Sequence, residues 1–180
     1  TLIDEQRPAL VHVHHLAGLA ASLIGVAVRR GLPVVHQVQD WWASCARSNL
    51  VDAWGRPCPG PSPSRCSRCL PLTGLRPRWL LNRGLHLVRR RWLARQVRAA
   101  SAYVMGSRSI RDWYRDHDLL SPGAPVWVLR YGVDSGAAAA PRAPELPLVF
   151  GVVGAVMPHK GTHVAVDAFA DGFGGDLGHR

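Results

Sequence analysis

Lysine is almost absent from this sequence. Of 22 basic residues only Lys160 is a lysine, so 21 (22 − 1) are arginine. Acidic residues are scarce as well, with 12 in total, which leaves a net charge of +10. A basic balance favours acidic partners such as phosphates, nucleic acid or an anionic membrane. Because a preference for arginine also reflects genome composition, the charge alone does not indicate nucleic-acid binding.

Long apolar runs, a signal peptide and internal repeats are missing too. No run is long enough to span a membrane, and the start, TLIDEQRP, does not resemble a signal peptide. We therefore expect a cytoplasmic protein. Hydrophobic residues make up 47% of the 180 residues and charged ones 19%, which is a globular composition. The chain lacks an initiator methionine and stops at DGFGGDLGHR without completing a unit, so we expect a fragment of a longer protein.

The first two thirds of the chain alternate between strand and helix patterns. A buried strand over 9–14 precedes a helix over 18–31, which ends at Arg29, Arg30 and Gly31, and a strand over 32–39 follows. This order is typical of a βαβ unit and predicts a parallel sheet. Further on, a strand over 101–106, a helix over 108–118 capped by Ser107 and a strand over 126–134 continue the pattern. The expected fold class is α/β.

Two segments interrupt this pattern and suggest the domain limits. Residues 43–75 hold all four cysteines and a Pro/Gly/Ser cluster, which indicates a Cys-rich insertion. Residues 135–146 have the composition of a linker. The expected domains are therefore 1–134 and 147–180, the second beginning with a strand over 147–154 and a helix over 162–170.

The only lysine stands in the loop GAVMPHKG, residues 154–161. A helix N-terminus beyond a strand favours phosphate, because it presents free N–H groups and a positive dipole. Gly154 permits a tight turn, Gly161 permits a close backbone approach, and Lys160 adds a charge. The loop matches neither GxxxxGK[ST] nor GxGxxG, so the alternative is an ordinary loop with a solvated lysine.

Four stretches of the chain resemble retaining glycosyltransferase family 4, in the order found in that family. They are VHVHHLAG (11–18), PVVHQVQDWWASC (33–45), YVMGSRSIRDWY (103–114) with VLRYGVD (128–134), and LVFGVVGAVMPHKGTHVAVDAFA (148–170). The resemblance implies the GT-B fold of two facing Rossmann-like domains, each with a parallel sheet. Residues 1–134 resemble the later part of the N-terminal, acceptor-side domain, and 147–180 resemble the truncated start of the donor-binding domain.

The resemblance implies transfer of a hexosyl group from a nucleotide-diphosphate sugar to a hydroxyl acceptor, in polysaccharide or glycolipid synthesis. Lys160, Gly154 and Gly161 would bind the donor phosphates without a catalytic cofactor. Ala155 stands where the family often has an arginine, which weakens this expected phosphate contact. The family's downstream acidic residues would lie beyond Arg180, so this chain alone is expected to be inactive.

The resemblance also implies an acceptor cleft with His15 and Asp40 as catalytic candidates. Gly18 and Gln39 would border it. The family often has histidine where Gln39 stands, and an amide cannot titrate. The alternatives are structural histidines and a turn cap at Asp40. An interdomain turn would contain Tyr131, Gly132 and Asp134.

The four cysteines follow the spacing Cys45-x12-Cys58-x7-Cys66-x2-Cys69. Four thiolates can complete a tetrahedral zinc shell, so we expect a structural zinc, with disulfides or free thiols as alternatives. This site and the net charge also support an alternative function, a zinc-stabilised basic module that binds nucleic acid. The distribution of arginines over the whole chain argues against nucleic acid as a partner.

A helix over 77–98 carries Leu81, Leu85, Val88 and Trp92 at spacings of four, three and four, with arginines around the rest. This stripe either packs against the sheet or docks on anionic lipid. Docking would give peripheral contact with the inner membrane face, close to a lipid-linked or saccharide acceptor.

Overall fold

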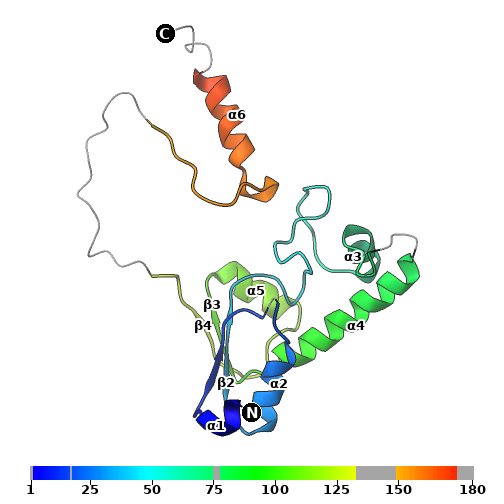
Figure 1. The fold of residues 1–180 in the computed structure, drawn as a ribbon, viewed down its shortest axis with the longest axis vertical. Coiled ribbons are helices and arrows are strands. Elements are labelled where there is room, and N and C mark those ends of the chain that lie inside the picture. Colours follow the sequence, from blue (N-terminus) through cyan, green and yellow to red (C-terminus); the bar gives the residue numbers. More distant parts are fainter. Residues whose placement is uncertain (1, 17, 75–77, 133–148, 174–180) are drawn as a thin grey trace, which may run out of the picture. The chain divides into compact units, whose positions relative to one another are not determined.

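The computed structural model describes residues 2–16, 18–74, 78–132 and 149–173 (Figure 1). The chain divides into two compact units, Thr1–Gly132 and Val133–Arg180. The expected 135–146 linker lies outside the described residues, and the proposed domain roles stay predictions.

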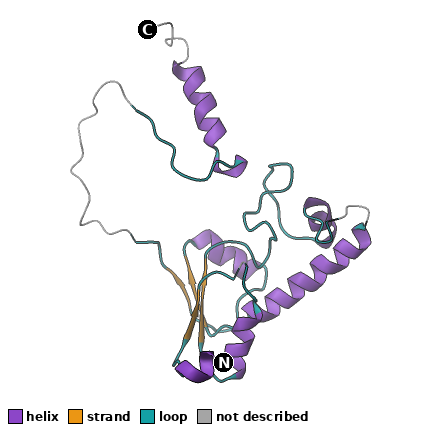
Figure 2. Ribbon diagram, viewed as in Figure 1, coloured by secondary structure: helices purple, strands orange, loops and turns teal. Residues whose placement is uncertain are grey.

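The first unit is built on a four-stranded parallel sheet. Its strands are β1 (Val11–Val13), β2 (Val34–Val38), β3 (Ala102–Met105) and β4 (Val126–Val128). They lie in the order β1-β2-β3-β4, with every neighbouring pair parallel. The helices α2 (Ser22–Arg29), α4 (Trp79–Val97) and α5 (Arg108–Asp116) lie in the three crossovers (Figure 2). This confirms the expected α/β class with a Rossmann-like parallel sheet.

Local signals end and begin two of these helices as expected. Gly31, with φ +73°, follows α2, and its N–H donates to the Val28 carbonyl at 2.9 Å. The Ser107 hydroxyl accepts a hydrogen bond from the Ile110 N–H at 3.3 Å and caps α5. A short helix, α1 (Leu2–Gln6), precedes β1 and was not anticipated.

The core lies between the sheet and its helices. Ile24 and Ala27 of α2 and Leu93 and Val97 of α4 join residues of β2 and β3 there. Tyr103 is fully buried, and its hydroxyl donates to the Val97 carbonyl at 2.9 Å while accepting from the Ser121 N–H at 2.9 Å. A buried tyrosine needs such partners, so this ring links β3 to the end of α4.

The cysteine segment, residues 43–74, contains one helix, α3 (Pro63–Cys69), which packs against α4. Ser62 caps α3 by accepting from the Arg65 N–H at 3.1 Å. Asp52 holds a tight turn by accepting from the N–H groups of Trp54 and Arg56, both at 2.9 Å. Turns and caps of this kind order much of the segment.

Only part of α4 packs as its apolar pattern suggests. The buried residues are Asn82, His86, Leu93 and Val97, whereas Leu81, Leu85, Val88 and Trp92 are exposed. The interpretation in which this stripe packs against the sheet is therefore wrong.

The second unit is described over residues 149–173. A 3₁₀ turn, Pro158–Lys160, leads into α6 (Thr162–Phe173), which confirms the expected helix. The strand expected over 147–154 is absent from 149–154. A strand needs a hydrogen-bonded neighbour, and the described part of this unit contains no second strand. Phe150 instead packs its ring against Phe169 and Phe173 at 5.7 and 6.1 Å.

Candidate active site

The carboxyl ends of the parallel strands bring two predicted residues together. His15 follows β1 and Asp40 follows β2, and these strands are paired neighbours. The His15 Nε2 atom lies 3.7 Å from the Asp40 Oδ2 atom, which is within ion-pair range. Both side chains are partly exposed, at 38% and 28%. A histidine and a carboxylate that solvent can reach thus stand side by side at the sheet edge where α/β folds bind ligands.

Asp40 is held in place by its second oxygen. Its Oδ1 atom accepts a hydrogen bond from the Trp42 N–H at 2.7 Å. The Tyr114 hydroxyl donates to the Asp40 backbone carbonyl at 3.4 Å. Asp40 therefore caps the turn, which was the alternative considered from its sequence position. Its Oδ2 atom faces His15.

Trp42 and Tyr114 were missed in the sequence analysis, and Trp42 has the larger role. Its ring lies edge-on to the His15 imidazole, 6.3 Å between centroids. Its carbonyl accepts from Arg89 Nη2 at 2.8 Å, and the Arg89 guanidinium lies over the indole ring. The signal was the Asp-Trp-Trp sequence itself, because an aspartate often caps the residue two positions on.

His36 lies buried within β2 and differs from the exposed histidines. Burial and, to a smaller extent, the nearby charge of His15 together lower the pKa of His36 to about 4. Its Nδ1 atom is buried without a hydrogen-bond partner among the described residues. This histidine therefore stays neutral at physiological pH. The imidazole that lies beside Asp40 is that of His15.

The remaining first-unit candidates come after the strands in the chain, Gly18 after β1, Gln39 after β2 and Tyr131 after β4. Gly18 takes φ +82° in the turn after β1, where the Leu19 N–H donates to the Leu16 carbonyl at 3.0 Å. Gln39 is exposed beside Asp40. Tyr131 packs its ring against Gly106 at the end of β3, where an added Cβ would lie 3.1 Å from the ring.

The interdomain-turn prediction is only partly covered. Gly132 is the last described residue of the first unit, and Asp134 lies outside the described residues.

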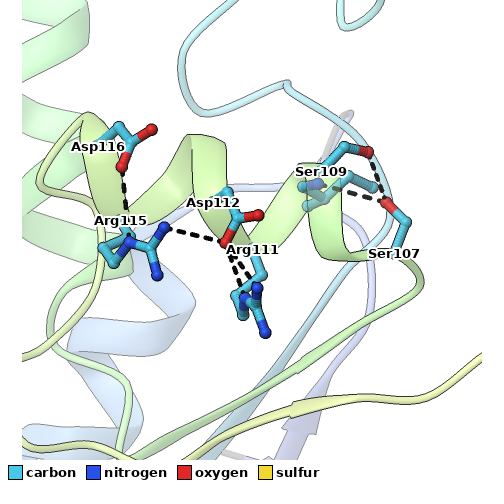
Figure 3. A network of polar contacts seen from close by, with 7 residues as sticks. Ser107, Ser109, Arg111, Asp112, Arg115 and Asp116 are labelled. Carbon is cyan, nitrogen blue, oxygen red and sulfur yellow. Dashed lines mark hydrogen bonds and ion pairs between the residues drawn. The ribbon is translucent and has the colours of Figure 1, made fainter.

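The acids of α5 are engaged within their own helix. Arg111 and Arg115 both pair with Asp112, at 2.8 and 3.1 Å, and Arg115 also pairs with Asp116 at 3.5 Å (Figure 3). Each of these two carboxylates therefore has an arginine partner within its own helix.

The four cysteines line one small cavity of about 30 Å³, together with His86 and Arg65. All four are free, and burial raises the pKa of Cys66. Over the described ranges, no three His, Cys, Asp or Glu residues are arranged to hold a metal ion. The thiols thus share a cavity without metal-ligand geometry, and the structural zinc stays a prediction.

The lysine loop belongs to the second unit and is described by itself. Gly154 has φ +153° and Gly161 has φ +73°, which are conformations that favour glycine. The exposed Lys160 ends the 3₁₀ turn two residues before α6 begins.

A family model described as Glycosyltransferase Family 4 matches residues 1–137. This chain belongs to glycosyltransferase family 4. The match confirms the resemblance and contains the His15–Asp40 pair and the cysteine segment, while the lysine loop lies outside it. No curated protein and no solved structure matches the chain.

Membership of family 4 identifies the chain as a glycosyltransferase. Neither this match nor the described residues favour the alternative of a zinc-stabilised nucleic-acid module. Within the described ranges, no helix has the length and apolarity needed to cross a bilayer.

Proposed function

We propose that this family 4 glycosyltransferase moves a hexosyl group from a nucleotide-diphosphate sugar to a hydroxyl acceptor. The acceptor is a saccharide or a lipid-linked saccharide in polysaccharide or glycolipid synthesis. The acceptor oxygen bonds to the anomeric carbon, and the bond from that carbon to the donor diphosphate breaks. The reaction must therefore remove a proton from the acceptor and stabilise negative charge on the leaving diphosphate.

The observation that carries the proposal is the 3.7 Å contact between His15 and Asp40. A neutral imidazole can accept the proton of the acceptor hydroxyl, and the Asp40 carboxylate then stabilises the imidazolium that forms. The Trp42 N–H binds one oxygen of Asp40, and the other oxygen faces His15, which supports this role. Gly18, in the turn after β1, and Gln39, next to Asp40 in the chain, are proposed to border the acceptor.

The donor end of the reaction is assigned to the lysine loop. The Lys160 ammonium and the first N–H groups of α6 carry positive charge at the start of this helix. A cation placed where charge grows on a leaving group lowers the barrier to its departure. Gly154 and Gly161 give this loop the backbone conformation that lets a phosphate approach.

The test is a donor screen on the full-length protein. UDP- and GDP-sugars are supplied with and without saccharide acceptors, and release of nucleoside diphosphate is measured. His15→Gln and Asp40→Asn should slow acceptor-dependent turnover by roughly 10²- to 10⁴-fold, the usual contribution of a general base. Lys160→Ala should chiefly lower kcat, because it removes a charge that stabilises the diphosphate as it departs.

His12→Gln is the matched control, because His12 is an exposed histidine of β1 outside the pair. It should retain wild-type turnover. Equal activity in the His15, Asp40 and His12 variants would rule out a catalytic role for the His15–Asp40 pair.

A further inference from the structure

The outward side of α4 carries apolar residues where a surface helix normally carries polar ones. We call Leu81, Leu85, Val88 and Trp92 the outer stripe, since their spacing places them on one helix face. Leu81 is 49% exposed and Val88 is 65% exposed. Leu80, which adjoins the stripe, is 66% exposed. A contiguous exposed apolar face of this kind marks an interaction site more often than it marks plain solvent contact.

The polar residues of α4 explain why this face is outermost. Asn82 is fully buried, and its Oδ1 atom accepts from the Thr73 N–H at 3.0 Å and from the Thr73 hydroxyl at 3.2 Å. The His86 Nε2 atom lies 2.8 Å from the Leu70 carbonyl. These contacts fasten the end of the cysteine segment to α4 and fix the rotation of the helix. Figure 1 shows this half of α4 extending away from the sheet with α3 alongside it.

The charged side chains of the α4 segment are all of one sign. Residues 78–98 contain seven arginines and no acid. Arg91 follows Val88 by three residues and Arg95 follows Trp92 by three, so both border the outer stripe. Neither has a hydrogen-bond or ion-pair partner among the described residues. Arg89, in contrast, is engaged by the Trp42 carbonyl and ring and does not belong to this surface.

We infer that the outer stripe of α4 docks the protein on an anionic lipid surface. Leucine, valine and tryptophan side chains enter the boundary between head groups and acyl chains, and Arg91 and Arg95 contact acidic head groups. A nucleic acid would satisfy the arginines but would leave Leu81 and Val88 in water. The combination of both residue types on one face therefore favours a membrane over a polyanion.

The test is flotation of the full-length protein with vesicles of phosphatidylcholine, alone or mixed with phosphatidylglycerol, in the absence of any sugar donor. Wild type should float only with the mixed vesicles. Arg91→Gln/Arg95→Gln should weaken binding by roughly tenfold or more, since each basic residue near an anionic surface contributes severalfold. Leu81→Gln/Val88→Gln should weaken it comparably without changing the net charge.

Arg83→Gln/Arg90→Gln is the matched control. Each of these exposed arginines stands two residues after a stripe residue, about 200° around the helix. This variant loses the same charge and should float nearly as well as wild type. Circular dichroism should show that every variant keeps its helix content.

Three outcomes would overturn the inference. They are failure of wild type to float with mixed vesicles, equal losses in the two arginine pairs, and no effect of the Leu81/Val88 pair. Binding to a DNA duplex that depends on Arg91 and Arg95 but not on Leu81 and Val88, with no flotation, would assign the surface to nucleic acid instead. Because no donor is present, the result does not depend on the proposed catalytic pair.

Discussion

His15 Nε2 and Asp40 Oδ2 lie 3.7 Å apart at the carboxyl ends of two paired parallel strands. The other oxygen of Asp40 accepts from the Trp42 N–H. One carboxylate thus has a structural oxygen and an oxygen that faces an imidazole, and the two tasks can be separated by mutation.

Asp40→Asn and Asp40→Ala should separate them. Asparagine keeps an oxygen for the Trp42 N–H but loses the charge, so its free energy of unfolding should stay within about 0.5 kcal/mol of wild type. Alanine removes the acceptor as well and should cost about 1 kcal/mol, the usual net value of one hydrogen bond. Both should lose acceptor-dependent turnover. Urea unfolding measures the two changes in stability. An Asp40→Asn protein with normal acceptor-dependent turnover would contradict the predicted loss of activity.

Stability should fall on the acid side because of His36. Burial lowers the pKa of His36 from 6.5 to about 4, so the unfolded chain binds a proton at a pH where the folded chain does not. The contribution of neutral His36 to the free energy of unfolding is fully present above pH 6.5. It decreases below that pH and is lost as the pH falls through about 4. The difference of 6.5 − 4 corresponds to roughly 3 kcal/mol.

The measurement is urea unfolding at pH 7 and at pH 4.5. His36→Leu should show a much smaller loss between the two conditions, because leucine cannot take up the proton. An unchanged pH dependence in this variant would mean that other groups control acid stability.

The buried amide of α4 should matter more than its exposed leucines. Asn82→Ala leaves the Thr73 N–H and hydroxyl without this partner and should cost about 1–3 kcal/mol. Leu81→Ala, one position away and half exposed, should change stability by no more than about 0.5 kcal/mol. Denaturant midpoints compare the two, and a larger effect at Leu81 would show that the helix is rotated from the position described.

The four cysteines around the small cavity lead to a prediction about thiol reactivity. Burial raises the pKa of Cys66 and of Cys69, so these thiols should alkylate slowly at neutral pH and faster as the pH rises above 9. The structural-zinc hypothesis adds that purified protein contains about one zinc per chain, held by the four cysteines. A chelator should then speed alkylation. Metal-free protein whose thiol reactivity ignores the chelator would rule that hypothesis out.

Helix ends and the order of elements were accessible from sequence because their causes are local. Gly31 ends α2 and Ser107 begins α5 through contacts within a few residues. The strand expected over 147–154 failed for the opposite reason. Its apolar residues can form a strand only beside another one, and the described part of the second unit has none.

The candidate site was only partly accessible for the same reason. His15 and Asp40 could be named from their places after two strands, but their separation depends on the pairing of β1 with β2. The role of Trp42 depends on the tertiary structure, because its N–H, carbonyl and ring contact three different residues.

The amino-acid sequence by itself determined that this chain builds a parallel α/β sheet and places polar residues after its strands, because hydrophobic periodicity and caps act over short distances. Only the tertiary structure decided which face of α4 is buried. The stripe of leucine, valine and tryptophan is more apolar than the face with Asn82 and His86, yet the latter is inside. Partners for that amide and imidazole come from Thr73 and Leu70, and a polar group that gains hydrogen bonds on burial can set a helix rotation against its apolar pattern.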